Sequence, residues 1–192
     1  MGTLESNCEE DMIIDKPIVI ENLCDKFHNK ILLQYLSIYK GWSICNDFTS
    51  YGDTAPSVNT NTYSDGGFIA RTFSLEQPMP ENSYHLNEAA YFILSKVAMH
   101  LDIKTYTGHR YNWNYYNRSS TGTQHRDADK SASLVSILYN LNTNDGGTII
   151  DGTMYSSVAG TAIVFPSHIL HKGVGPTKSS QRYNLNIIFA ER

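Results

Sequence analysis

Two stretches of this sequence carry the residue types of a metal site. In TQHRDADK, His125 and Asp127 stand two positions apart, and PSHILHKGVG contains His168 and His171. Side chains two positions apart in an extended segment point the same way, so His125 and Asp127 would present an imidazole and a carboxylate together. Two histidines and one carboxylate form a facial triad that suits Fe(II) and leaves coordination positions open. Either late histidine could complete it, and the alternative is polar residues scattered over a β-rich surface.

An arginine follows these histidines on a strand-like run, QRYNLNIIF. Alternation along a strand places Arg182 and Asn184 on one face of this run. The planar guanidinium of arginine binds a carboxylate through two parallel hydrogen bonds, which lysine does less well. Arg182 is therefore a candidate anchor for a carboxylate. Histidine, aspartate, histidine and arginine in this order are a more specific signal than the His-x-Asp pair alone.

Three stretches alternate between polar and apolar residues. The polar faces carry Arg110, Asn112, Asn114 and Tyr116 in HRYNWNYY, Ser136, Leu138 and Asn140 in SLVSILYN, and Arg182, Asn184 and Asn186 in QRYNLNIIF. Half-exposed antiparallel strands have this pattern, with the polar face in water. Alternatively, the polar faces line a cavity, which would imply a polar ligand because buried polar groups need partners. Alternation alone does not choose between the two.

The elements that would position these residues are mostly short strands. After about residue 105, seven stretches of strand character are separated by turn signals such as NTNDGG and GPTKSS. Before it, KPIVIENL and FIARTF predict strands. Apolar spacing predicts one helix with Phe27, Ile31 and Tyr35 along one face, and a second helix over about residues 83–101. We therefore expect a mainly β protein, a jelly roll (double-stranded β-helix), with the N-terminal helices packed on one outer face.

The composition is that of an ordinary globular protein. The chain has 192 residues, 41% of them hydrophobic, which favours one domain with residues 1–104 as helical support and lid and 105–192 as the core. A net charge of −4 argues against nucleic-acid binding. We expect a cytoplasmic protein that is not bound to a membrane, because the three cysteines form no CxxC motif and the sequence contains no signal sequence and no membrane-spanning run. We also expect a monomer or a homodimer.

The stretch from about residue 105 to 190 resembles the 2-oxoglutarate- and Fe(II)-dependent oxygenases, especially their prolyl-4-hydroxylase-like branch. The features that carry the resemblance are HRD, the GG before the strand TII, the run GTAIVFP, and a histidine separated by ten residues from an arginine on the closing strand. The resemblance implies that His125, Asp127 and His171 are the iron ligands. His171 has the family's usual distance to the arginine, whereas His168 would face the other way in a strand.

The same resemblance implies a binding site for the co-substrate. Arg182 would pair with the distal carboxylate of 2-oxoglutarate while the keto-acid end chelates iron. A tyrosine on the strand before HRD would add a hydrogen bond; Tyr116 is nearest to that position, and Tyr115 is the alternative. Asn140 falls where some relatives place another hydrogen-bonding side chain, and Asn184 shares the face of Arg182.

The implied activity is hydroxylation of a C–H bond in a peptidyl or small-molecule substrate. Fe(II), 2-oxoglutarate and O2 would take part, with ascorbate as a reductant, and succinate and CO2 would be released. The presence of Asp127 favours hydroxylation over halogenation, for which relatives carry a small residue at that position. Arg71 and Arg118 could meet an anionic or peptide substrate or be solvated charges. The alternatives are a noncatalytic jelly-roll ligand-binding module and another metal-dependent, cupin-like enzyme.

Overall fold

The computed structural model describes residues 14–45, 67–75 and 83–191. The helices are α1 (Lys26–Ile38) and α2 (Tyr84–His100), with one 3-10 turn at Lys130–Ala132. The strands are β1 (Ile18–Ile20), β2 (Ser43–Cys45), β3 (Gly67–Ser74), β4 (Tyr106–Asn117), β5 (Leu134–Asn140), β6 (Gly147–Ile150), β7 (Thr153–Ser156), β8 (Ala162–Pro166), β9 (His171–Val174) and β10 (Gln181–Glu191). Residues 49–66, within the region 1–104 expected to act as support and lid, lie outside the described residues.

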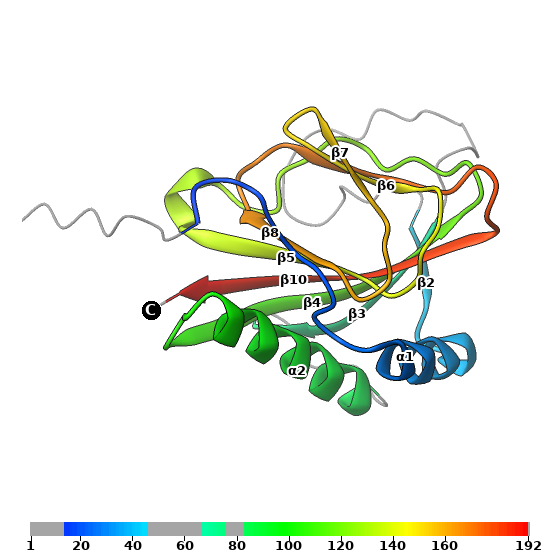
Figure 1. Cartoon of the computed structure of the whole chain (residues 1–192), viewed down its shortest axis with the longest axis horizontal. Coiled ribbons are helices and arrows are strands. Elements are labelled where there is room, and N and C mark those ends of the chain that lie inside the picture. Colours follow the sequence, from blue (N-terminus) through cyan, green and yellow to red (C-terminus); the bar gives the residue numbers. More distant parts are fainter. Residues whose placement is uncertain (1–13, 46–66, 76–82, 192) are drawn as a thin grey trace, which may run out of the picture.

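The strands form two antiparallel sheets that face each other (Figure 1). The larger sheet has the order β1-β8-β5-β10-β4-β3-β2, and the smaller has the order β7-β6-β9. Isolated bridges from Thr121 to Val174 and from His125 to His171 extend the smaller sheet beyond β9. Between the sheets, Ile150 of β6 packs with Phe165 of β8. This arrangement is the predicted jelly roll, and the predicted fold class is confirmed.

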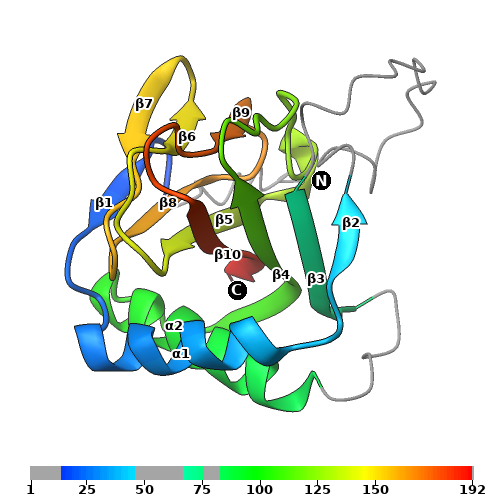
Figure 2. The same ribbon diagram turned by 90° about the vertical axis from the view of Figure 1, so that its right-hand side faces the viewer.

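Both helices cover the outer face of the larger sheet, opposite the smaller sheet (Figure 2). The main hydrophobic core lies there. Trp113, Leu185 and Ile187 from the strands pack with apolar residues of α2 such as Leu86 and Ile93, all fully buried. Burial of each such side chain stabilises the fold by roughly 1.5–3 kcal/mol. The apolar half of each alternating strand is thus used on this side, which leaves the polar half for the other.

The predicted helix α1 exists, but only part of its predicted apolar stripe, including Tyr35, packs against the core. Phe27 and Ile31 are 71% and 48% exposed, and the residues buried on this helix include Leu32 and Leu36. The rotation of the helix is fixed by a polar contact as well as by packing. The buried hydroxyl of Tyr139 donates a hydrogen bond to the side chain of Asn29, which turns the face containing Asn29, Leu32 and Leu36 inward.

The predicted strands after residue 105 all occur, with one difference next to the candidate site. The stretch HILHKGVG predicts a strand from His168, whereas β9 begins at His171 and residues 167–169 form a turn. FIARTF is the strand β3, as predicted, and it pairs with β4 in the larger sheet. None of the helices in the described ranges combines the length and hydropathy needed to cross a bilayer.

Candidate metal centre

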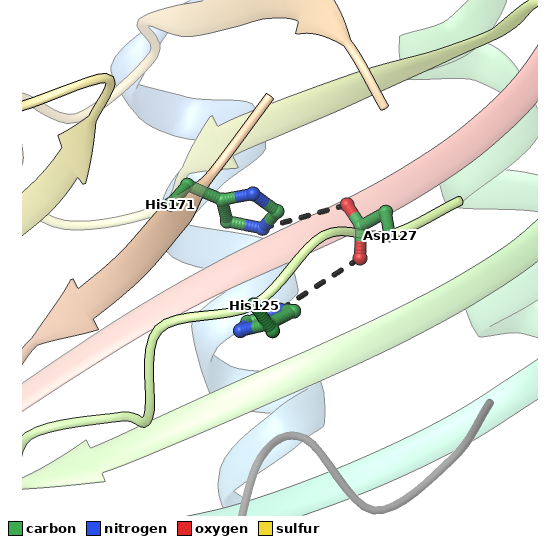
Figure 3. A group of neighbouring side chains, drawn as sticks. All are labelled: His125, Asp127 and His171. Atoms are coloured by element: carbon green, nitrogen blue, oxygen red, sulfur yellow. Dashed lines mark ion pairs between the residues drawn. The ribbon is translucent and has the colours of Figure 1, made fainter. Parts of the chain in front are cut away.

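The structure brings together the side chains of His125, Asp127 and His171 (Figure 3). Their possible ligand atoms all lie within 4.8 Å of one another. The backbones of the two histidines exchange both hydrogen bonds, each 2.9 Å from nitrogen to oxygen. Such a pair holds two side chains on the same side of the sheet. The fold therefore places the imidazoles side by side, with ring centroids 4.3 Å apart.

Each imidazole is also oriented by the backbone carbonyl two residues before it. The Nδ1 atom of His125 lies 2.9 Å from the carbonyl oxygen of Thr123, and the Nδ1 atom of His171 lies 3.0 Å from that of Ile169. A proton on Nδ1 would donate to the carbonyl, leaving the Nε2 lone pair of each ring available to a metal. Both Nε2 atoms face Asp127, at 3.9 Å and 3.6 Å from its oxygens.

Asp127 is held from both its backbone and its carboxylate. Its backbone N–H donates to the carbonyl of Ser167 at 2.9 Å, which fixes the loop after His125. One carboxylate oxygen, Oδ2, accepts from Ser136 Oγ at 2.7 Å and from Asn186 Nδ2 at 3.1 Å. The other oxygen, Oδ1, accepts from a terminal nitrogen of Arg110 at 2.9 Å. The side chain is 3% exposed, so these bonds replace solvation by water.

The electrostatics favour donor groups that are ready for a cation at neutral pH. Burial alone would raise the pKa of Asp127, but His171, Arg110 and His125 outweigh it and lower the pKa to about 2. Burial, followed by the neighbouring His171, lowers the pKa of His125. An ionised carboxylate beside two imidazoles is the donor set of a non-haem Fe(II) site. The three residues fit that metal.

The polar strand faces line the interior between the sheets, so the solvated alternative is wrong. In the register of the larger sheet, Asn184 lies opposite both Asn114 and Asn140, and Arg182 lies opposite Tyr116. These residues are all at most 7% exposed. Several of their polar atoms are buried without a partner in the described part of the chain. They are Arg110 Nε, Asn114 Oδ1, Asn140 Nδ2, Arg182 Nε, Asn184 Nδ2 and Asn186 Oδ1. Such an interior fits a polar ligand.

Arg182 is a large polar side chain of this interior that has no negatively charged partner among the described residues. It is 0% exposed, and its terminal nitrogens donate to Thr148 Oγ1 at 2.7 Å and to the carbonyl of Val174 at 3.3 Å. It forms no salt bridge with any carboxylate of the described residues, and burial lowers its pKa to about 10. A buried guanidinium bonded only to neutral oxygens lacks its counterion, and a carboxylate would supply it.

The two candidate tyrosines lie on opposite faces of β4. Tyr116 faces inward, is 5% exposed, and has its ring 4.9 Å from the guanidinium carbon of Arg182. A side chain at Gly173 would collide with the Tyr116 hydroxyl, so the glycine makes room for this ring. Tyr115 faces outward, with its ring 4.8 Å from that of Tyr183. Of the two, Tyr116 lies beside the predicted anchor.

Other residues singled out in the sequence lie elsewhere. His168 sits in the turn before β9 and is not among the grouped metal-binding atoms of the described chain. Arg118 is on the surface, where it donates to the carbonyls of Lys178 and Ser179. Arg71 is on the inner side, where its Nε donates to Asn112 Oδ1 at 3.2 Å.

Sequence reasoning missed the residues that support this site. Arg110, Ser136 and Asn186 were visible on the polar strand faces, but nothing in the sequence showed that all three meet at Asp127. Thr148 gave no signal, because its role depends on β6 lying across the interior from Arg182.

No protein-family model matches this sequence, and no curated protein matches it. Solved structures match over nearly the whole chain. A Pseudomonas putida prolyl-4-hydroxylase is 15% identical, with a TM-score of 0.60 over 95% of this chain and 96% of that one. The viral collagen prolyl hydroxylase of Paramecium Bursaria Chlorella virus-1, solved with 2OG, is 15% identical, with a TM-score of 0.58 over 92% and 97%. The epimerase SnoN, solved with Fe3+ and alpha ketoglutarate, is 8% identical, with a TM-score of 0.66 over 95% and 83%. The chain therefore has the fold shared by the prolyl-4-hydroxylases and 2OG-Fe(II) oxygenases, as its sequence predicted.

Proposed function

We propose that this protein is a 2-oxoglutarate- and Fe(II)-dependent dioxygenase. It would hydroxylate a C–H bond of a peptidyl or small-molecule substrate and release succinate and CO2. The observation that carries the proposal is the combination of a three-donor metal centre with a buried, uncompensated arginine on the same polar interior. A metal site alone would serve many functions, and the arginine adds a place for a carboxylate.

In this proposal His125, Asp127 and His171 hold the metal. Arg182 binds the distal carboxylate of 2-oxoglutarate, and the unpartnered amide nitrogen of Asn140, Nδ2, can donate to its oxygens. Tyr116 and Asn184 complete the wall around the co-substrate. When bound, Fe(II) supplies the activation of O2 that couples decarboxylation of 2-oxoglutarate to substrate oxidation. One oxygen atom ends in succinate and the other in the hydroxylated product.

The chain itself holds the metal ligands in position. Ser136, Asn186 and Arg110 fix the carboxylate of Asp127 so that it does not rotate away from the imidazoles. Phe165 packs edge-on against His171 with ring centroids 5.0 Å apart, which places an apolar ring beside this ligand.

The test is formation of succinate from 2-oxoglutarate with Fe(II), ascorbate and O2, together with anaerobic binding. We expect a weak visible charge-transfer band when 2-oxoglutarate is added to the anaerobic Fe(II) protein. Both signals should be lost in Asp127→Ala and His171→Ala and kept in the matched control His168→Ala. Absence of both succinate and the anaerobic band in the wild type would reject the enzyme. A bound metal indifferent to 2-oxoglutarate would instead indicate a noncatalytic binding module.

A further inference from the structure

We propose that Arg110 binds a carboxylate of the substrate that is oxidised. The substrate class is then a small carboxylic acid, which includes free amino acids, rather than a neutral internal residue of a peptide. This inference rests on the proposed function and deepens it. It concerns a second arginine of the interior, separate from the one assigned to 2-oxoglutarate.

The two arginines lie at different ends of the lined interior. Arg110 and Tyr116 are on the same face of β4, and Tyr116 is the register partner of Arg182. Arg110 and Tyr116 are six positions apart along β4, which corresponds to roughly 20 Å between their Cα atoms. The metal centre is at the Arg110 end, because Arg110 contacts Asp127 directly. A 2-oxoglutarate molecule reaching from the metal to Arg182 extends away from Arg110, which leaves Arg110 for another ligand.

Arg110 has bonding capacity that Asp127 does not use. One terminal nitrogen donates to Asp127 Oδ1, while its Nε is buried without a partner among the described residues. The guanidinium has five N–H donors in a fixed plane, so one contact leaves a fork available. The side chain is 19% exposed, which keeps it accessible from the interior. Ser136 and Asn186 hold the other oxygen of Asp127 with neutral donors, so anchoring this carboxylate does not by itself call for a cation.

The charge balance points to an anion. A divalent iron, the dianion 2-oxoglutarate, Asp127 and Arg182 together carry no net charge. Arg110 then leaves the site with one net positive charge, because its ion-pair partner Asp127 is already counted in that balance, and buried charges are balanced in folded proteins. Arg71 of β3 brings a second guanidinium to the same face, bonded to Asn112, the residue two positions after Arg110. A carboxylate held near these groups would sit beside the metal, with its neighbouring C–H bonds toward the reacting position.

The inference is tested by binding, with propionate and its neutral isostere propionamide as probes. Protein loaded with Mn(II) and saturated with 2-oxoglutarate is titrated with each probe by calorimetry. We expect saturable binding of propionate, with propionamide at least about tenfold weaker because a charge-assisted pair is lost. Arg110→Gln should weaken propionate at least about tenfold, and Arg110→Lys, which keeps the charge but loses the planar fork, should weaken it less than Arg110→Gln does. Arg118→Gln, an exposed arginine outside the interior, is the matched control and should bind like the wild type.

The outcomes separate this inference from the proposed function. Wild-type protein that binds neither Mn(II) nor 2-oxoglutarate refutes the proposed function, and with it the role of Arg110, before any probe is added. Normal Mn(II) and 2-oxoglutarate binding without propionate binding overturns the role of Arg110 alone. Equal affinity for propionamide, or unchanged propionate affinity in Arg110→Gln, also overturns it. If Arg110→Gln loses Mn(II), the lysine variant and the wild-type preference for propionate over propionamide decide the question.

Discussion

Replacing Arg182 by methionine should weaken co-substrate binding strongly while leaving the stability of the fold nearly unchanged. Burial lowers the pKa of Arg182 from its ordinary value to about 10, and at 1.36 kcal/mol per pKa unit the buried charge costs about 3 kcal/mol at neutral pH. Its hydrogen bonds to Thr148 and Val174 offset much of that cost. Methionine removes the charge and the bonds together and still fills apolar space. We expect a change of about 1 kcal/mol or less in the free energy of unfolding.

The effect on 2-oxoglutarate should be far larger. Losing one partner of a buried charged pair costs at least about 2 kcal/mol, which is roughly a 30-fold increase in Kd. Urea unfolding of the metal-free, ligand-free protein measures the first quantity, and calorimetric titration of 2-oxoglutarate into Mn(II)-loaded protein measures the second. Arg118→Met removes an exposed arginine and serves as the control for both.

Two results would refute this reasoning. A loss of more than about 2 kcal/mol of stability in Arg182→Met would mean that the arginine is a structural link between the sheets, as in an ordinary core truncation. An unchanged Kd for 2-oxoglutarate would mean that the carboxylate binds elsewhere, and Arg182 would lose its assigned role.

Three further predictions concern the metal centre and the loop between β9 and β10. His171→Ala should weaken Mn(II) binding at least about 100-fold and His168→Ala should not, as measured by equilibrium dialysis; the reverse would exchange their roles. The pKa of Asp127 in the folded protein is about 2, below its ordinary value of 3.8. Its ionised form therefore contributes about 2 kcal/mol to the free energy of unfolding at pH values above 3.8, and this contribution is lost as the pH falls toward 2. Urea midpoints against pH should therefore be flatter over that range in Asp127→Asn. Asp145 accepts from the backbone N–H groups of residues 177–179, and these bonds, first that of Ser179, lower its pKa. Asp145→Asn should lower the thermal midpoint, and an unchanged midpoint would show that this loop does not limit unfolding.

Much of the fold was predictable because strand alternation is written directly into the sequence. The polar and apolar faces of β4 and β10 follow from a period of two, and their apolar halves form the core under the helices. The face of α1 was not predictable in the same way. Its sequence has two apolar stripes, and the choice between them depends on the hydroxyl of Tyr139, more than one hundred residues away, which needs Asn29 as acceptor. No local pattern contains that contact.

The candidate site was likewise predictable only in part. His125 and Asp127 could be read as a pair from a spacing of two, and His171 and Arg182 through the family resemblance. Their supports could not, because each depends on the register between strands. Only the pairing of β5 and β10 brings Ser136 and Asn186 to the same carboxylate, and only the approach of the smaller sheet gives Arg182 a neutral acceptor. Sequence spacing identifies groups within one strand, while register decides which groups from different strands meet.

The division of each strand into two faces also explains how the protein tolerates its polar interior. Unpartnered amides and an uncompensated guanidinium destabilise the ligand-free fold, since each buried polar group without a partner costs roughly 1–3 kcal/mol. The outer face of the same strands compensates, because Trp113, Leu185 and Ile187 are packed against the helices without solvent exposure. Stability and ligand binding thus reside on opposite faces of one sheet. A metal, a dicarboxylate and an anionic substrate would give the polar groups of the inner face partners. Ligand binding should therefore raise the free energy of unfolding by more than replacing one of these polar residues lowers it.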